Sequence, residues 1–199
     1  MEHHHEIFAE LNMKPATPIS RSVSIAASAS DLWTAISDAG NLKRLHPFCE
    51  RNEVERWPGP KGIDHIYYYS GVHYQRDVLS WHDGQGYDLM VGPLSGKTSF
   101  AKWRIEEFSP NACNFSIEVT SYIRNDVSSE DRSRYETRVI KRAIPPYLDA
   151  VVQGVAYFVE TGDPVTRNQF DASEIYSPTL PTSLPSLNQL HSNVFQSPP

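Results

Sequence analysis

Apolar and polar residues alternate along much of the chain between residues 19 and 124, which is the pattern of half-buried β-strands. Segments rich in Val, Ile and aromatic residues are separated by the turn sequences PGPKG, SG, HDGQG, GPLSGK and SPN. We expect strands at residues 19–27, 49–57, 63–70, 73–81, 87–91, 98–108 and 112–124. Because these linkers are too short for parallel crossovers, the seven strands are predicted to form a mostly antiparallel sheet.

Helical periodicity replaces this alternation after the first strand. Ser28 and Asp31 have the spacing of a capping box, and apolar residues then recur at helical intervals until Gly40. A second short helix is predicted at residues 41–45, since His46 precedes a proline and proline disfavours the α conformation in the residue before it. Two short helices in tandem therefore follow the first strand.

A long helix is predicted to begin or kink at Pro145 and Pro146. Residues 135–142 also have a helical pattern, whereas the polar residues 125–134 are predicted to form a loop. The apolar stripe of the long helix consists of Leu148, Val151, Val152, Val155, Phe158 and Val159. Gly154 lies inside this helix, where glycine costs about 1 kcal/mol relative to alanine, so it indicates either a close backbone approach or spare room at the sheet.

The composition fits one globular core with atypical ends. Hydrophobic residues make up 39% of the chain and charged residues 21%, and no apolar run approaches the ~20 residues that cross a bilayer. We expect a flexible N-terminal segment at residues 1–18, a single domain at residues 19–170, and a Ser/Pro-rich unstructured tail at residues 171–199. The start of the chain does not resemble a secretory signal, so we expect a cytoplasmic location without membrane insertion.

Charge and motifs narrow the functional classes. The formal net charge is −6 and Lys and Arg do not cluster, which argues against a nucleic-acid partner. No P-loop, dinucleotide-binding or G-x-S-x-G sequence is present, and we expect no cofactor. His65, His73 and His82 lack the close spacing of a compact metal site, so we expect no metal. Cys49 and Cys113 are expected to stay reduced.

The predicted order of elements resembles that of the SRPBCC superfamily, also described as START/Bet v 1-like or polyketide cyclase/dehydrase-like proteins. The similarity covers roughly residues 19–162 and is carried by SIAASASDLWTAISDAGNLKRLHPF, HYQRDVLSWHDG, KWRIEEFSP and YLDAVVQGVAYFVETGDPVTRNQF. The last of these segments is similar to the ending of an uncharacterised bacterial subgroup, although DASEIYS at residues 171–177 differs from the Gly-Ser-His-Pro type run of that subgroup.

This resemblance implies an α+β helix-grip fold, in which a curved seven-stranded antiparallel sheet wraps around the long helix and encloses a cavity. It also implies a small hydrophobic or amphipathic ligand, such as a lipid or a polyketide, and a protein that is a monomer or a homodimer. The superfamily includes both binders and enzymes, so a polyketide cyclase/dehydratase-type enzyme acting in the same cavity is the alternative. A third alternative is a protein-interaction module that uses SPTLPTSLPSL as a linear motif.

Candidate ligand-binding residues come from the strands and the long helix. Tyr67, Tyr68 and Tyr69 place hydroxyls on both faces of one strand, so at least one points inward in either register. Tyr67 and Tyr69, which share one face, are our candidates, and ordinary packing is the alternative. One of Arg76 and Asp77 must face the concave side, and we favour Arg76, with an outward salt bridge as the alternative. The other candidate cavity walls, which ordinary core packing explains equally well, are Met90, Trp103, Tyr122, Tyr147, Val151 and Val155.

Overall fold

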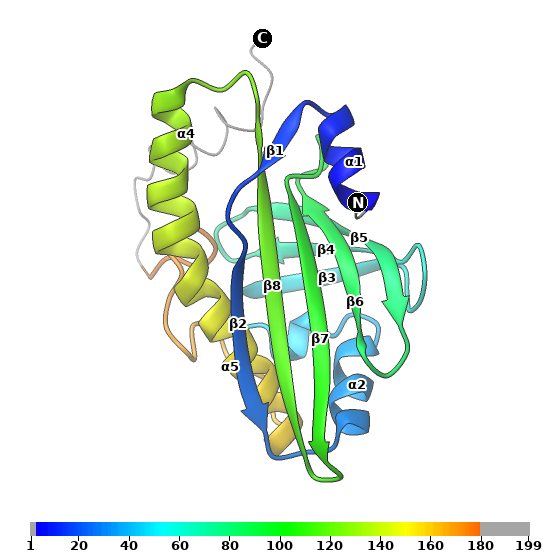
Figure 1. The fold of residues 1–199 in the computed structure, drawn as a ribbon. Coiled ribbons are helices and arrows are strands. Elements are labelled where there is room, and N and C mark those ends of the chain that lie inside the picture. The colour runs from blue at the N-terminus through cyan, green and yellow to red at the C-terminus, as the bar shows by residue number, and fades with distance from the viewer. Residues whose placement is uncertain (1–2, 180–199) are drawn as a thin grey trace.

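An antiparallel sheet curves around a long C-terminal run of helix in the computed structural model, which describes residues 3–179 (Figure 1). The eight strands of the described residues are β1 (Met13–Pro15), β2 (Ile19–Ile25), β3 (Cys49–Arg56), β4 (Ile63–Tyr68), β5 (His73–His82), β6 (Gly86–Gly92), β7 (Ser99–Ser109) and β8 (Ala112–Arg124). Their order is β1-β8-β7-β6-β5-β4-β3, and β2 also pairs with β8. The expected α+β helix-grip fold is confirmed, and β1 is an additional strand.

The helical segments of the described chain are α1 (His3–Glu10), α2 (Ala29–Ser37), α3 (Leu42–Leu45), α4 (Ser129–Tyr135), the π-helical η1 (Glu136–Ala143) and α5 (Ile144–Thr161). The Ser28 side chain accepts a hydrogen bond from the Asp31 N–H at 3.0 Å, so the predicted cap of α2 is confirmed. Pro145 and Pro146 lie in the first turn of α5, where a helix needs no N–H donor. Among the described helices, none has the length and apolar character needed to cross a membrane.

The loop predicted at residues 125–134 is wrong in its second half, because α4 begins at Ser129. Ser128 caps this helix, since its Oγ accepts a hydrogen bond from the Asp131 N–H at 3.1 Å. Most residues of α4 are polar, and its buried residue is Tyr135. A polar helix of this kind lacks the apolar periodicity on which the prediction rests, and the cap at Ser128 is the signal that identifies it.

The expectation that residues 1–18 form a flexible segment outside the fold is corrected for the part that the structure describes. β1 pairs with the end of β8, and α1 lies beside it (Figure 1). Phe8 of α1 is fully buried, with its ring centroid 3.7 Å from that of Tyr122. The segment therefore covers a second, smaller apolar cluster on the sheet. This cluster contains Phe8, Met13, Met90, Phe100 and Tyr122.

Close packing of α5 against the turn after α3 explains Gly154. A Cβ atom at this position would lie 2.5 Å from the Leu45 carbonyl oxygen and 3.1 Å from Pro47 Cδ. Of the two explanations for this glycine, close backbone approach is confirmed and spare room at the sheet is wrong. The contact also holds His46, which lies between Leu45 and Pro47, beside α5.

The prediction that an unstructured tail begins at residue 171 is corrected for residues 173–177. Ser173 and Ser177 form a β-bridge, and only 7% of the Tyr176 surface is exposed. The Ser70 N–H donates to the Tyr176 carbonyl oxygen at 3.0 Å, which fixes this segment beside β4. The buried Tyr176 ring therefore anchors residues 173–177, although the composition of this segment does not predict that it packs against the domain. Residues 180–199 of the predicted tail lie outside the described residues.

Candidate functional site

A cavity of about 80 Å³ lies between the inner face of the sheet and α5. One water requires ~10–15 Å³ of such a cavity, so there is room for about six waters. Six waters occupy about the same volume in the liquid as one aromatic ring. The apolar lining consists of Leu42, Ile66, Leu89, Val91, Ala101, Trp103, Ile117, Val119, Ile144, Leu148 and Val151. The polar lining consists of His46, Tyr68, Tyr74, Arg76, Ser99, Tyr147 and Tyr176.

Four of the residues predicted from the sequence line this cavity, namely Arg76, Trp103, Tyr147 and Val151. Trp103 belongs to the sheet, whereas Tyr147 and Val151 belong to α5, so the cavity brings both layers together. Val155 lies one turn further along α5 and is fully buried in the core beside the cavity, without lining it.

Met90 and Tyr122 do not reach the cavity and belong to the apolar cluster under α1. On β6, Leu89 and Val91 line the cavity, and Met90 between them points to the opposite face because side chains alternate along a strand. The Tyr122 hydroxyl lies 2.6 Å from His5 Nδ1 of α1. Their placement on the cavity wall is therefore corrected.

Tyr68, and not Tyr67 or Tyr69, faces the cavity. Ile66 is buried on the inner face of β4, and Tyr68 follows it by two residues, so the two side chains share that face. The Tyr67 hydroxyl donates to Glu53 at 2.9 Å on the outer face. The inward placement of Tyr67 and Tyr69 is wrong, because both lie an odd number of residues from Ile66 and therefore point to the opposite face of the strand.

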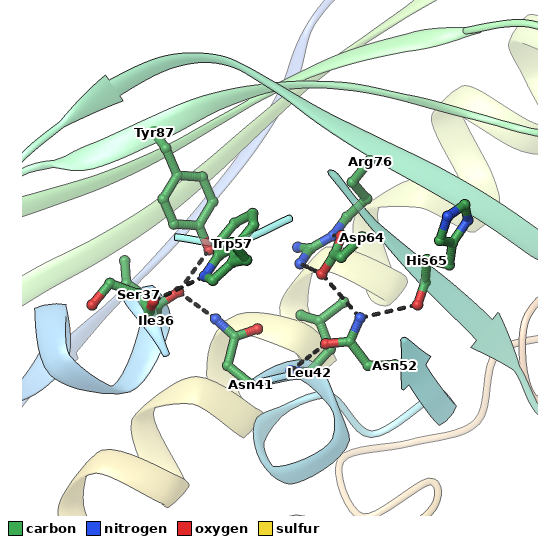
Figure 2. Close-up of polar contacts among 10 residues, drawn as sticks. All are labelled: Ile36, Ser37, Asn41, Leu42, Asn52, Trp57, Asp64, His65, Arg76 and Tyr87. Carbon is green, nitrogen blue, oxygen red and sulfur yellow. Dashed lines mark hydrogen bonds and ion pairs between the residues drawn. The ribbon is translucent and has the colours of Figure 1, made fainter. Parts of the chain in front are cut away.

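Arg76 faces the cavity, as predicted, and its charge is paired (Figure 2). Its Nε donates to Asp64 Oδ1 at 2.7 Å, its Nη2 contacts Asp64 Oδ2, and Asn52 Nδ2 donates to Asp64 Oδ2 at 2.9 Å. Arg76 is 4% exposed and Asp64 1%, so the two charges depend on each other. Asp77, the alternative, pairs with Lys97 at 3.0 Å. Burial raises the pKa of the nearby Tyr87 hydroxyl, and the Arg76 charge opposes this rise, but no described residue meets Arg76 Nη1 in hydrogen-bonding geometry.

Aromatic rings frame the Arg76 guanidinium. Its central carbon lies 5.5 Å from the ring centroid of Trp57 and 6.0 Å from that of Trp103, within the range of cation–π attraction. Trp57 Nε1 donates to the Ser37 carbonyl oxygen at 2.9 Å at the end of α2 (Figure 2). The carbonyl groups that a helix leaves open at its C-terminus therefore help to fix the position of Trp57 beside Arg76.

His46 belongs to a hydrogen-bonded chain on the cavity wall. The Phe48 N–H donates to His46 Nδ1 at 3.2 Å, His46 Nε2 lies 3.1 Å from the Tyr147 hydroxyl, and that hydroxyl lies 3.2 Å from the hydroxyl of Tyr68. Burial and the nearby positive charge of Arg76 lower the pKa of His46 to about 3. The imidazole is therefore neutral at neutral pH.

The tyrosines of the cavity keep their protons at neutral pH. Burial, followed by the neighbouring tyrosines, raises the pKa of Tyr68 and Tyr74 well above that of an ordinary phenol. Burial likewise raises the pKa of Tyr147, and it raises the pKa of Tyr176 to about 12. Their hydroxyl groups consequently serve as hydrogen-bond donors, and the cavity carries no phenolate at neutral pH.

The site residues that sequence reasoning did not single out are His46, Asp64, Tyr68, Tyr74 and Tyr176. The alternation that places Ile66 inward also places Asp64 and Tyr68 inward, so Ile66 is the signal that could have identified both. His46 only ended a helix in the sequence, and Tyr176 fell within the expected tail. No local pattern distinguishes either residue.

Among the side chains that the structure describes, no group of three or more His, Cys, Asp or Glu residues is arranged to hold a metal ion. His65 Nδ1 lies 3.2 Å from His73 Nε2, between β4 and β5. His82 lies instead beside Asp88, at 3.4 Å.

Comparisons with known proteins agree with this architecture. The family model described as "Polyketide cyclase / dehydrase and lipid transport" matches residues 17–155. A structure of norcoclaurine synthase from Thalictrum flavum, in complex with dopamine and hydroxybenzaldehyde, is similar with a TM-score of 0.57 and 14% sequence identity. The similarity covers 77% of this chain and 91% of that one.

Two further structures share the fold. XoxI from Bacillus cereus has a TM-score of 0.51 and 12% identity, with 71% of this chain and 94% of that one covered. DynU16, from the dynemicin biosynthetic locus, has a TM-score of 0.53 and 13% identity, with 77% of this chain and 52% of that one covered. A comparison with curated protein sequences gives no match. At these identities the similarity shows the fold and not an activity.

Proposed function

Because the chain belongs to the family described as polyketide cyclase / dehydrase and lipid transport, we propose that it binds a small amphipathic molecule in the cavity between the sheet and α5. The observation that carries this proposal is Arg76 Nη1, a buried polar atom of a cavity-lining side chain that has no partner in the described chain. Leaving such an atom without a hydrogen bond costs free energy, so a ligand oxygen beside it stabilises the complex.

The volume of the cavity favours a compact ligand. Its 80 Å³ corresponds to roughly the space of one aromatic ring, as argued above. Norcoclaurine synthase, which shares the fold, was solved with dopamine and hydroxybenzaldehyde, and both are one-ring compounds. A lipid chain or an extended polyketide exceeds this volume, so binding of such a ligand requires one wall of the cavity to move.

An enzyme of the cyclase or dehydratase type, acting in the same cavity, is the second candidate. The Tyr68 and Tyr147 hydroxyls favour it, because general acid catalysis requires a proton donor within reach of the reacting oxygen. Binding ranks first because the raised pKa values of these tyrosines and the lowered pKa of His46 make all three groups poor acids and bases at neutral pH.

The proposal is tested by an NMR titration with acetophenone, a one-ring compound with one acceptor oxygen. We expect saturable binding to the wild-type protein. Val151→Phe should abolish binding because the added ring fills the cavity, whereas Gln153→Phe, on the exposed face of α5, should retain it. Circular dichroism establishes that both variants fold. Equal binding by the two variants would place the probe elsewhere and contradict the proposal.

A further inference from the structure

The protons of the His46 chain can be assigned from its partners. The backbone N–H of Phe48 can only donate, so His46 Nδ1 is the acceptor of their 3.2 Å hydrogen bond and carries no proton. A neutral imidazole then carries its proton on Nε2, which donates to the Tyr147 hydroxyl oxygen at 3.1 Å. The backbone after α3 therefore fixes one tautomer of His46.

With this tautomer, one of the two phenol O–H groups of Tyr68 and Tyr147 has no acceptor. The Tyr147 and Tyr68 hydroxyl oxygens lie 3.2 Å apart, and one of the two O–H groups supplies the bond between them. The other O–H has no acceptor, because neither hydroxyl has a further hydrogen-bond partner among residues 3–179. Both tyrosines line the cavity, so a ligand can accept this proton.

Arg76 adds a second donor to the same cavity. Its Nη1 is the open atom, while Nε and Nη2 are bound to Asp64. The Asp64 oxygens already accept bonds from Arg76 and Asn52, so this carboxylate is not open to a ligand. This part of the cavity therefore offers hydrogen-bond donors, namely one phenol O–H and the N–H groups of Arg76 Nη1. The ligand must supply the acceptor.

The charges around these donors cancel. Arg76 is paired with Asp64, His46 accepts from a backbone N–H and is neutral, and burial keeps Tyr68 and Tyr147 protonated by raising their pKa. A carboxylate ligand would introduce a buried negative charge beside Asp64 that no free cation of this group offsets. A neutral carbonyl oxygen accepts the same hydrogen bonds without that cost.

We propose that this part of the cavity is a binding site for a neutral carbonyl oxygen, which accepts hydrogen bonds from Arg76 Nη1 and from the free hydroxyl of the Tyr68–Tyr147 pair. His46 is the positioning residue, because its Nε2 donates to Tyr147 and therefore cannot accept an O–H from that pair. This inference rests on the proposed function and adds the chemical class of the ligand. The ligand is a one-ring ketone, aldehyde or ester and not an acid.

Three probes of almost the same shape test the ligand class: α-methylstyrene, acetophenone and benzoate present a methylene, a carbonyl oxygen and a carboxylate, respectively. We expect acetophenone to bind about tenfold or more tightly than α-methylstyrene, as one or two net hydrogen bonds require. Benzoate should bind more weakly than acetophenone at pH 7. The carbonyl carbon of ¹³C-labelled acetophenone should also shift downfield on binding.

The outcomes separate this inference from the proposed function. If none of the three probes binds, the proposed function fails. If α-methylstyrene and acetophenone bind equally, the cavity is a binding site but the carbonyl site is overturned. If benzoate binds more tightly than acetophenone, the ligand class is an anion and the inference is likewise overturned.

Variants of His46 test its positioning role. His46→Leu leaves the pair its spare O–H but removes the bond that holds the Tyr147 hydroxyl in position, so the affinity ratio of acetophenone to α-methylstyrene should fall, by at most the roughly fivefold that one neutral hydrogen bond is worth. His46→Gln, whose amide can accept from Phe48 and donate to Tyr147, should retain the ratio. A purely structural role would weaken both probes equally and leave the ratio unchanged, which would overturn the positioning claim. The ¹⁵N spectrum of the wild-type protein gives a second test, since a proton on Nδ1 would contradict the assigned tautomer.

Discussion

Arg76 and Asp64 form a charge pair that water hardly reaches, and the two residues occupy opposite positions on β4 and β5. Two hydrogen bonds join the guanidinium to the carboxylate, and Asn52 donates a third bond to Asp64. Such a pair adds little net stability over an apolar pair, but each charge is costly without the other. The pair therefore fixes the orientation of the Arg76 guanidinium on the cavity wall more than it stabilises the fold.

Removing one partner of this pair should be strongly destabilising. Asp64→Asn leaves the Arg76 charge buried without compensation, and we expect a loss of about 3–5 kcal/mol in the free energy of unfolding. Asp77→Asn, the same change in the partly exposed pair with Lys97, should cost about 0–1 kcal/mol. Urea denaturation measures both values. Similar losses in the two variants would show that the buried pair is not a structural constraint.

His46 should make the stability depend on pH. Its pKa is lowered from 6.5 to about 3 in the folded protein, so between these values the unfolded chain binds a proton that the folded one does not. The contribution of neutral His46 to the free energy of unfolding is therefore fully present above pH 6.5. As the pH decreases toward 3, this contribution falls by at most about 4–5 kcal/mol. His46→Gln should flatten this dependence relative to wild type, whereas His82→Gln, at an exposed position, should not. Parallel pH profiles for wild type and His46→Gln would refute the assignment.

The inward residues of β4 and β5 show where sequence reasoning about the site succeeds and fails. Arg76 could be placed because a charged residue in the middle of a strand must be paired or face a ligand. Three consecutive tyrosines carry no alternation of their own, so the sequence does not show whether Tyr67 or Tyr68 faces inward. A buried carboxylate is not expected on the inner face of a strand unless a cation lies beside it. The sequence does not show that Arg76 lies opposite Asp64, so Asp64 cannot be assigned to the site from the sequence.

At the scale of elements, periodicity and turn residues predicted the strands from β2 to β8 and the helices α2, α3 and α5. The elements that were missed are α1, β1 and α4, and all three are short or polar. Of these, α1 and β1 depend on the sheet for their stability, because β1 pairs with β8 and a short helix is marginal in isolation. Such elements cannot be recognised before the surface that they cover is known.

The contact between α5 and the turn after α3 gives a prediction at this scale. Alanine favours a helix interior by about 1 kcal/mol over glycine, yet Gly154→Ala should be destabilising because its Cβ would lie 2.5 Å from the Leu45 carbonyl oxygen. We expect a net loss of about 1–3 kcal/mol, as for an overpacked core. Gln153→Ala, on the exposed face of α5, should change stability by less than about 0.5 kcal/mol. A higher melting temperature for Gly154→Ala would contradict the close contact.

At the scale of the molecule, the cavity is assembled from parts that are distant in the sequence. The inner face of the sheet, α5, the turn that carries His46 and the segment that carries Tyr176 each contribute a wall. Tyr176 contacts the rings of Tyr68 and Tyr147, with centroids 4.4 and 4.7 Å away. Its segment belongs neither to the sheet nor to the long helix, so this ring can be removed without a change in either layer.

Removal of the Tyr176 ring should therefore enlarge the cavity. Tyr176→Ala is expected to bind 1-acetonaphthone, a two-ring ketone that exceeds the wild-type cavity, with at least tenfold higher affinity than wild type. Tyr157→Ala, the same change near the end of α5 and away from the cavity lining, should leave the affinity unchanged. Isothermal titration calorimetry measures the three affinities. Equal affinities for wild type and Tyr176→Ala would show that Tyr176 does not limit the cavity.

The central claim is that a small amphipathic molecule occupies the cavity between the sheet and α5. The most direct measurement is a ¹³C-methyl NMR titration of valine-labelled protein with acetophenone. We predict saturable shifts for the methyl groups of Val91, Val119 and Val151, which line the cavity, and none for Val54, which is exposed on β3. Shifts at Val54 that equal those at Val151, or an unchanged spectrum at saturating probe, would contradict the account.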